Sequence, residues 1–299
     1  MSTQRLDVAL LAAGLARSRT HARRIIEEGR ARLNGTAPTR AATPVPDGAR
    51  LEVVDVPDGI EYASRAAHKL LGALEALGLD PAGLSCLDAG ASTGGFTDVL
   101  LRRGAAHVLA VDIGHDQLAE HVRSDARVSV HDGTSVRDLT PDLLGQRVDL
   151  IVADLSFISL RTVLPALATV LRPRGELLLM VKPQFEVGRQ ALPKSGVVTD
   201  PAARLRAVEG VVEAAAHEGL ELLAVGPSTL PGQDGNHEYF VHLAPGGARS
   251  APAAQACDMI RTAVHDQRPI RRADLPGQQR MRDRATMTST DQQHSDEGD

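Results

Sequence analysis

The hydrophobic pattern divides the chain into a short first segment and a longer second one. In the first segment, apolar residues recur at helical spacing from Leu6 to Leu15, and a second helical pattern follows Ser18 and ends before Gly29. Two short strand patterns come next, one entering an Asn-Gly turn at residues 32–35 and one at residues 51–56. The pattern predicts a small α+β domain over residues 1–59 and a linker over residues 60–63.

From residue 64 to residue 246, helical and strand patterns alternate. The expected helices cover residues 66–77, 94–103, 117–123, 160–171 and 201–218. The expected strands cover residues 85–89, 107–112, 128–131, 148–153, 176–181, 220–225 and 238–243. This alternation is typical of an α/β fold, here a Rossmann-like doubly wound domain with a mostly parallel seven-stranded sheet.

The last segment, residues 247–299, has a different composition. One more helix is expected around residues 253–265, and the Gln-, Ser-, Thr- and Asp-rich end that follows is expected to be disordered.

Composition narrows the class of protein. The chain has 299 residues, of which 42% are hydrophobic and only 2% are aromatic, so its core must be aliphatic. Cys86 and Cys257 have no disulfide or metal-ligand spacing, and no apolar run is long enough to span a bilayer. With no secretory signal at the N-terminus, we expect a cytoplasmic protein that is monomeric and uses neither a membrane nor a metal.

Charge is distributed unevenly along the chain. Residues 1–40 hold eight arginines against three carboxylates, a net charge of +5, whereas the whole chain carries −5 and the remainder therefore −10. A solvated helix face would explain such a run. Clustered next to a small hairpin, however, these arginines favour a surface that contacts the phosphates of RNA.

A glycine-rich turn follows the first strand of the alternating segment. Asp88 ends that strand, and Gly90, Gly94 and Gly95 lie in the turn before a helix. The spacing differs from the dinucleotide fingerprint, and such a turn can also be purely structural. Glycine lets a ligand approach the backbone closely, and the helix N-terminus supplies unpaired N–H groups.

Two further strands end in polar groups on the same expected edge of the sheet. Asp112 lies 24 residues after Asp88, where an acid binds ribose hydroxyls in nucleotide-binding folds, and Asp132-Gly133 ends the next strand. Because no pyrophosphate fingerprint is present, the pattern favours S-adenosylmethionine over a dinucleotide. The residues expected to bind it are Asp88, Gly90, Ser92, Gly94, Gly95, Phe96, Asp112, Ile113, Asp132, Gly133 and Asp154.

Charged residues that could react lie at the ends of the remaining strands. Asp154 follows the fourth strand, Lys182 ends the fifth, and Glu238 begins the last. A lysine that ends an apolar strand beside a cofactor could take or share the proton of a weakly acidic hydroxyl, with Asp154 and Glu238 balancing its charge. Lys69, on the preceding helix, would by itself be assigned to the solvated surface.

Five motifs in order make the chain resemble a known family. They are SRAAHKL at residues 64–70, LDAGASTGGFT at 87–97, ADLSFIS at 153–159, VKPQFE at 181–186 and GNHEYF at 235–240. Together they resemble the TlyA family of ribosomal RNA 2′-O-methyltransferases, historically labelled haemolysins. That family combines an FtsJ-like catalytic domain with a first domain similar to the RNA-binding domain of small-subunit ribosomal protein S-four.

The resemblance implies a specific activity. It implies a catalytic tetrad of Lys69, Asp154, Lys182 and Glu238, and methylation of cytidine 2′-hydroxyls in one or both ribosomal subunits, which is linked to capreomycin susceptibility. It also implies that ribosomal RNA is bound by arginines of the first domain and of the first motif, namely Arg5, Arg17, Arg19, Arg23, Arg24 and Arg65. The alternatives are a pore-forming haemolysin, which needs a membrane-inserting segment, and an RNA-binding protein without catalytic activity.

Overall fold

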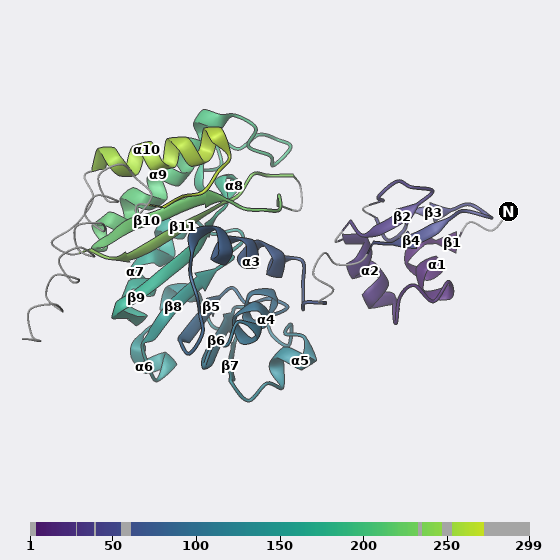
Figure 1. The fold of residues 1–299 in the computed structure, drawn as a ribbon, viewed down its shortest axis with the longest axis horizontal. Helices are drawn as coiled ribbons and strands as arrows, with labels where there is room; N and C mark the ends of the chain where they lie inside the picture. Colours follow the sequence, from purple (N-terminus) through teal and green to yellow (C-terminus); the bar gives the residue numbers. More distant parts are fainter. Residues whose placement is uncertain are drawn as a thin grey trace, which may run out of the picture. The chain divides into compact units, whose positions relative to one another are not determined.

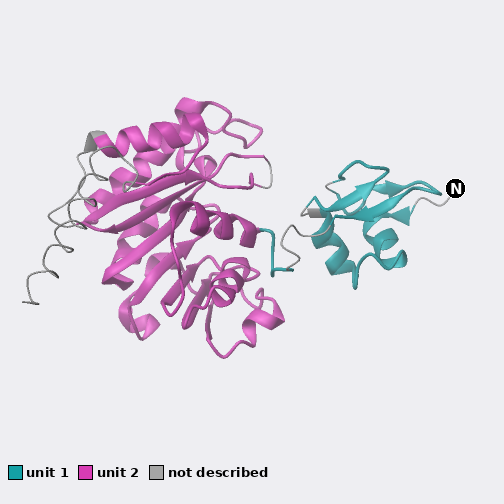
Figure 2. Cartoon of the chain, in the orientation of Figure 1, with its two compact units in different colours: residues 1–65 teal, residues 66–299 magenta. Residues whose placement is uncertain are grey.

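Two compact units make up the chain. The computed structural model describes residues 4–27, 29–38, 40–54, 61–232, 235–246 and 253–271. Its internal contacts separate Met1–Arg65 from Ala66–Asp299 (Figure 2). The expected linker residues 61–63 fall within the first of these units, and the predicted tail beyond residue 271 lies outside the described residues.

The first unit is a small α+β structure. Its elements are β1 (Gln4–Arg5), α1 (Leu6–Ala12), α2 (Arg19–Glu27), β2 (Ala31–Leu33), β3 (Pro44–Val45) and β4 (Leu51–Val53). β1 pairs with β3 and β2 pairs with β4, both antiparallel. The predicted Asn-Gly turn is confirmed, because Asn34 and Gly35 have φ values of 50° and 82° between the bridged residues Leu33 and Thr36.

A buried carboxylate organises the two helices of this unit. Asp7, in the first turn of α1, is enclosed, and its carboxylate lies 3.0 Å from Arg5 Nε, 3.3 Å from an Arg19 Nη and 3.4 Å from Arg23 Nε. The hydrogen bond from Arg5, with those from Arg19 and Arg23, holds the pKa of Asp7 well below its usual range against the opposing effect of burial. This carboxylate therefore ties β1 and α2 to the start of α1.

The second unit begins with a helix and continues with alternating strands and helices (Figure 1). The first half comprises α3 (Ala66–Leu77), β5 (Ser85–Ala89), α4 (Gly95–Arg102), β6 (His107–Asp112), α5 (Glu120–Arg123), β7 (Val128–Asp132), the 3-10 helix η1 (Val136–Asp138) and α6 (Pro141–Leu144). The second half comprises β8 (Val148–Ala153), α7 (Leu160–Val170), β9 (Leu171–Val181), α8 (Pro183–Glu186), α9 (Pro201–His217), β10 (Leu220–Pro227), β11 (Tyr239–Pro245), α10 (Ala253–Asp266) and β12 (Ile270–Arg271).

These strands form one mixed sheet in the order β12-β10-β11-β9-β8-β5-β6-β7. The five strands from β9 to β7 run parallel, whereas β11, β10 and β12 each pair antiparallel with their neighbours. The predicted mostly parallel sheet is confirmed. The described residues include an eighth strand, β12, beyond the seven that were predicted. It was not predicted because a two-residue edge strand is too short to leave a hydrophobic pattern.

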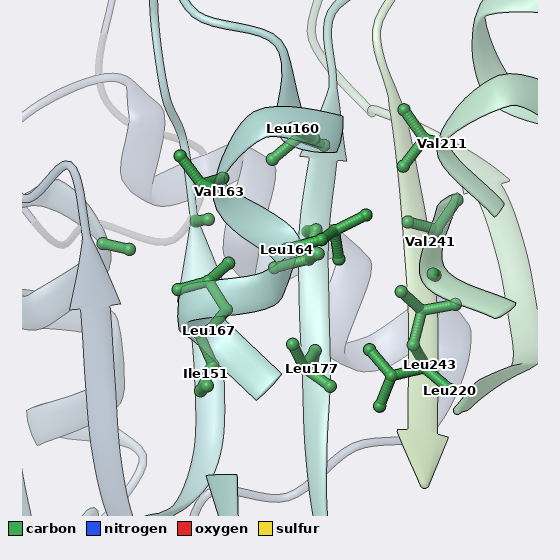
Figure 3. Packing of buried hydrophobic residues seen from close by; sticks show 14 of the residues in the cluster. Ile151, Leu160, Val163, Leu164, Leu167, Leu177, Val211, Leu220, Val241 and Leu243 are labelled. Atoms are coloured by element: carbon green, nitrogen blue, oxygen red, sulfur yellow. The ribbon is translucent and has the colours of Figure 1, made fainter. Parts of the chain in front are cut away.

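The core of this unit is aliphatic, as its composition predicts. On one face of the sheet, Leu160, Val163, Leu164 and Leu167 of α7 lie over Ile151 of β8 and Leu177 of β9 (Figure 3). Further members from α9, β10 and β11 continue the cluster, namely Val211, Leu220, Val241 and Leu243. α9 and α10 pack beside this layer, and α3 packs against α4.

Several element boundaries differ from the predicted ones. β9 begins at Leu171, five residues before the expected start, and α5 begins at Glu120 rather than Gln117. The short helices η1, α6 and α8 had no signal, since a single turn shows no periodicity. Within the described residues, no helix is long and apolar enough to cross a membrane.

Replacing Asp7 tests the organising role of its carboxylate. We expect Asp7→Ala to lower the free energy of unfolding of the first unit by about 2–3 kcal/mol, because three guanidinium groups lose a charged hydrogen-bond acceptor. Hydrogen exchange of α1 and α2 amides in the full chain would measure this. Asp47→Ala, at an exposed position in the same unit, is the control and should change exchange little. Equal protection in both variants would contradict the assignment.

Candidate active site

The glycine-rich turn joins β5 to α4 at the carboxyl edge of the sheet. Gly90, Ser92 and Gly94 all have positive φ values, of 87°, 46° and 90°. The N–H groups of Gly90 and Ala91 donate to the carbonyl of Val111 at 2.8 and 3.0 Å, which fixes the turn to β6. The left-handed conformations explain why glycine occupies two of these positions.

Gly90 also brings the turn into contact with the strand on its other side. A Cβ at Gly90 would lie 2.8 Å from the Leu155 side chain and 3.2 Å from the Asp154 carbonyl oxygen. The N–H of Asp154 in turn donates to the carbonyl of Ala89 at 3.3 Å. The turn and the segment after β8 therefore share one packed surface.

The ends of β6 and β7 close the same side of the turn. Asp112 accepts hydrogen bonds from the N–H groups of Ser92 (2.8 Å) and Gly114 (2.7 Å) through different oxygens. Asp132 accepts from Arg123 at 2.6 Å and from the Asp116 N–H at 3.1 Å, and the N–H of Gly133 donates to the Gly114 carbonyl. The predicted cofactor residues of three strands are thus brought together, with the side chain of Ile113 72% exposed beside them.

Asp88 differs from the other acids because it is completely buried. Its Oδ2 accepts a 2.7 Å hydrogen bond from Thr97 Oγ1, whereas its Oδ1 has no hydrogen-bond partner among the described residues. Burial raises the pKa of Asp88 to about 7, with the charges of Asp154 and Asp112 adding to the effect. A buried carboxylate with an unpartnered oxygen is suited to receive a cationic or hydrogen-bonding ligand.

Lys182 and Asp154 follow neighbouring parallel strands. β8 ends at Ala153 and β9 ends at Val181, so the residues that follow them, Asp154 and Lys182, lie at the same edge of the sheet. The Nζ of Lys182 lies 2.6 Å from Asp154 Oδ1 and donates to Ser156 Oγ at 2.9 Å. The lysine is buried, and Ser156 is a partner that the sequence did not single out.

Lys69 and Glu238 form a second buried pair at the same place. Tyr239 pairs with Val181 in the antiparallel ladder, and continuing this register puts Glu238 opposite Lys182. Glu238 Oε2 accepts from Lys69 Nζ at 2.5 Å. Lys69, which in isolation would be assigned to the surface, is therefore buried, and the four tetrad residues form two ion pairs on adjoining segments.

Close packing holds α3 in the position that this pair requires. Thr229 Oγ1 donates to the His68 carbonyl at 3.2 Å, and a Cβ at Gly72 would lie only 2.4 Å from Thr229 Cγ2. The segment before Glu238 is fixed by Asn236, whose side chain accepts from the Val198 N–H and donates to the Gly196 carbonyl.

An exposed aromatic residue beside Lys182 was also missed by the sequence analysis. Phe157 is 91% exposed and has a φ of 64°, which is strained for a bulky residue. Its ring centroid lies 5.2 Å from that of Phe185, and Lys182 Nζ lies 6.0 Å from the Phe185 ring centroid. The only signal in the sequence was a phenylalanine in a chain that has just four of them.

The structure sorts the predicted RNA-contacting arginines into two groups, each around a carboxylate. Arg5, Arg19 and Arg23 surround Asp7 and remain about half exposed. Arg17 and Arg24 pair with Glu61, which also contacts His21 at 3.0 Å. Arg65, the last residue of the first unit, is partly exposed. The described residues contain no cluster of side chains that could hold a metal ion.

Gly90 and Gly104 offer a matched test of the close packing at the turn. Both have left-handed φ values, 87° and 84°, but a Cβ at Gly104 would lie an ordinary 3.6 Å from Ala82. We expect Gly104→Ala to lower the free energy of unfolding by about 1–2 kcal/mol from backbone strain alone. Gly90→Ala should lower the free energy of unfolding by roughly 1–3 kcal/mol more than Gly104→Ala does, because it also displaces the segment at Asp154. Equal thermal shifts in the two variants would show that Gly90 is needed only for its backbone conformation.

Comparison with known proteins places this geometry in a family. The model of the FtsJ-like methyltransferase family matches residues 62–244, and that of the S4 domain matches residues 4–51. The 16S/23S rRNA (cytidine-2′-O)-methyltransferase TlyA of Mycobacterium tuberculosis is 48% identical over 262 residues, which cover 88% of this chain and 97% of the relative. The hemolysin A of Brachyspira hyodysenteriae is 34% identical over 80% of this chain and 99% of its own length.

A solved structure agrees with this relationship. A Streptococcus thermophilus protein that carries the name hemolysin superimposes with a TM-score of 0.67 at 32% identity, over 89% of this chain and 97% of that one. The described fold, the two matched domains and the full-length relatives lead to one conclusion. This chain belongs to the TlyA family of ribosomal RNA cytidine-2′-O-methyltransferases, with an FtsJ-like methyltransferase domain preceded by an S4 domain.

Proposed function

We propose that this chain transfers a methyl group from S-adenosylmethionine to the 2′-hydroxyl of a cytidine in the RNA of the small ribosomal subunit, the large subunit or both. The observation that carries the proposal is the position of Lys182 Nζ, 2.6 Å from Asp154 and 2.9 Å from Ser156. This group lies at the carboxyl edge of the sheet, the edge that also carries the glycine-rich turn.

The residues around the turn fit S-adenosylmethionine. At Gly90 the Leu155 side chain and the Asp154 carbonyl occupy the place of a Cβ, so the turn lies directly beside the segment that carries Asp154. The unpartnered Oδ1 of Asp88 suits the ammonium group of the methionine moiety, and Asp112 has lone pairs left for ribose hydroxyls. Asp132 and the exposed Ile113 would hold the adenine. When bound, the cofactor supplies an electrophilic methyl group on a positively charged sulfur.

Lys182 handles the oxygen that accepts the methyl group. An ammonium has three N–H donors. One donates to Ser156 Oγ, and the Asp154 carboxylate lies 2.6 Å from the nitrogen as its ion-pair partner. A remaining N–H can point at the 2′-oxygen and hold it in line with the methyl group. As the O–C bond forms and the methyl's bond to sulfur breaks, the hydroxyl proton would leave to the Lys182–Asp154 pair, in which the carboxylate has the lone pairs to accept it. Most of the rate enhancement would come from this alignment, as in other reactions that bring two substrates together.

The second ion pair, between Lys69 and Glu238, helps to position the substrate. Lys69 and Glu238 are buried together beside Lys182, so Glu238 also opposes the local excess of positive charge. In this proposal Lys69 helps to orient the ribose of the target nucleotide. The exposed ring of Phe157, backed by Phe185, offers a stacking surface for a base that has left its helix.

The first unit would supply affinity for RNA. Three half-exposed arginines share the single charge of Asp7, so this group keeps a net positive charge of about two. Each guanidinium has five N–H donors, which leaves donors free for phosphate after its contact with Asp7. These contacts set the arginine side chains in fixed directions before RNA binds.

Replacing Lys182 tests the assignment of the reacting group. Lys182→Ala should lower the single-turnover rate of methyl transfer to unmodified ribosomal subunits by about 100- to 10,000-fold, the usual range for a residue that moves a proton. Calorimetry should show that cofactor binding is kept. Lys194→Ala, at an exposed lysine of the same unit, is the control and should keep the wild-type rate. Turnover by a folded, cofactor-binding Lys182→Ala variant would exclude the assigned role.

The buried carboxylate of Asp88 makes cofactor affinity depend on pH. Its pKa of about 7 means that it is mostly neutral at pH 6 and mostly ionised at pH 8. Only the ionised form attracts the ammonium group, so the affinity advantage of wild type over Asp88→Asn should grow about tenfold from pH 6 to pH 8.

The ratio of the two dissociation constants, measured by calorimetry at each pH, is the quantity to compare. The cofactor's own amino group titrates identically in both experiments, so its contribution cancels. A ratio that stays constant over this range would show that Asp88 does not contact the ammonium group.

A further inference from the structure

The two segments that carry the Lys182–Asp154 pair meet a second time, behind the site. One segment runs from the end of β8 through Asp154 to Ser159, the N-cap of α7. The other runs from Lys182, the N-cap of α8, to Glu186 at the end of that helix. In front, they meet through Lys182, Asp154 and Ser156. The second meeting point is the side chain of Glu186.

The carboxylate of Glu186 is almost completely enclosed, with 2% of the side chain exposed. Its Oε1 accepts from the Leu160 N–H at 2.7 Å. Its Oε2 accepts from Ser159 Oγ at 2.6 Å and from Arg161 Nε at 3.2 Å. Arg161 also donates to the backbone carbonyl of Glu186 at 2.6 Å. Four hydrogen bonds thus join one residue of α8 to the first turn of α7.

These contacts suit a buried negative charge. The N–H groups of a helix N-terminus have no partners within the helix, and the helix dipole favours an anion there. Glu186 satisfies the Leu160 N–H, while Arg161 balances its charge. The carboxylate is therefore stable without solvent, and it holds its two partners in fixed positions.

The distances along the chain make this contact relevant to the reaction. Glu186 lies one helical turn after Lys182, and Ser159 lies five residues after Asp154. Any movement of the start of α7 relative to α8 must therefore change the position of Asp154 relative to Lys182. The contact between the rings of Phe157 and Phe185 lies between the same two segments.

We propose that Glu186 is a positioning residue for methyl transfer: it joins the N-terminus of α7 to the helical turn after Lys182 and so sets the distance between Lys182 and Asp154. It touches no reacting atom and is distinct from the tetrad. The inference rests on the role proposed for Lys182.

Two variants of Glu186 probe this role. Glu186→Asp keeps the charge but is one methylene shorter, so it must either lose the Leu160 N–H or pull α7 towards α8. A misplacement of about 1 Å can cost roughly 100-fold in rate, and we expect a loss of that size in kcat. Glu186→Gln keeps the length and one acceptor oxygen, so it should retain more activity, with kcat lowered about three- to tenfold. KM for cofactor and for ribosomal subunits should stay within about twofold, since no binding contact is removed.

Asp149 provides a matched control at the opposite edge of the sheet. Its carboxylate also joins two segments, accepting from the Ser85 N–H at 3.0 Å and from Arg172 Nη1 at 2.7 Å. Asp149→Asn should lower thermal stability as Glu186→Gln does, because each loses a charged acceptor between two segments. It should leave kcat unchanged, because the ladder between β8 and β9, from Leu150–Glu176 to Ala153–Leu179, separates this contact from Asp154 and Lys182.

The experiment compares wild type, the two Glu186 variants, Asp149→Asn and Lys182→Ala, all as full chains with ribosomal subunits from a strain that lacks the enzyme. A kcat loss in the Glu186 variants that is absent from Asp149→Asn, with KM values and cofactor affinity retained, supports the proposal. If Glu186→Asp does not fold, the same comparison with Glu186→Gln decides. A kcat within twofold of wild type in the folded variants, or an equal loss in Asp149→Asn, would overturn it. If Lys182→Ala keeps turnover, the proposed site itself is wrong, and this outcome is recognised independently of Glu186.

Discussion

The methyltransferase unit depends on the burial of two lysines in one place. An isolated ammonium loses several kcal/mol of solvation when it is buried, and only a close carboxylate and further hydrogen bonds compensate for that loss. Lys182 is stable where it is because Asp154 and Ser156 surround it, and Lys69 because Glu238 lies 2.5 Å away. Each pair joins segments that are distant in sequence. The pairs therefore fix α3, the ends of β8 and β9, and the start of β11 relative to one another.

This constraint also explains what the sequence could and could not predict. Parallel strands place their carboxyl ends at one edge, and that rule alone brought Asp88, Asp112, Asp132, Asp154 and Lys182 to the same side of the sheet. It did not say which carboxylate pairs with which lysine, because pairing depends on side-chain directions and on the antiparallel register of β11. Lys69 could not be located by pattern, since its helix precedes the sheet and its burial follows from packing at Gly72 and Thr229.

Loops and short elements gave the least information. Ser156 and Phe157 lie in a segment without periodicity, and the exposed position of Phe157 follows from a single positive φ. In the first unit, the sequence analysis counted Asp7 as a charge that opposes the arginines. The structure shows that its carboxylate arranges three of them. A charge count adds signs and ignores burial, so it cannot distinguish an acid that neutralises a surface from one that orients it.

The two units divide the work of RNA recognition by charge. The first unit, residues 1–65, carries a net charge of +2, with +5 in residues 1–40, and residues 66–299 carry −7. Long-range attraction to phosphate must therefore come from the first unit, because the second unit as a whole repels a polyanion. Close to its site, the second unit can bind RNA through contacts that do not rely on net charge. The exposed Phe157, which we propose as a stacking surface, would be one such group, because stacking on an aromatic ring depends on the face of the base rather than on the backbone.

The proposed cofactor site and the proposed reacting group are in direct contact within this unit. The glycine-rich turn has no room for a Cβ at Gly90 because the Asp154 carbonyl and the Leu155 side chain fill that space. The Asp154 N–H also donates to Ala89, the last residue before the turn. A ligand that fixes the conformation of the turn must therefore also fix the backbone of Asp154. Through the carboxylate of Asp154, it also fixes the position of the ammonium group of Lys182. In the proposed mechanism, the geometry that orients the 2′-hydroxyl would thus be completed by the same packing that shapes the proposed cofactor site.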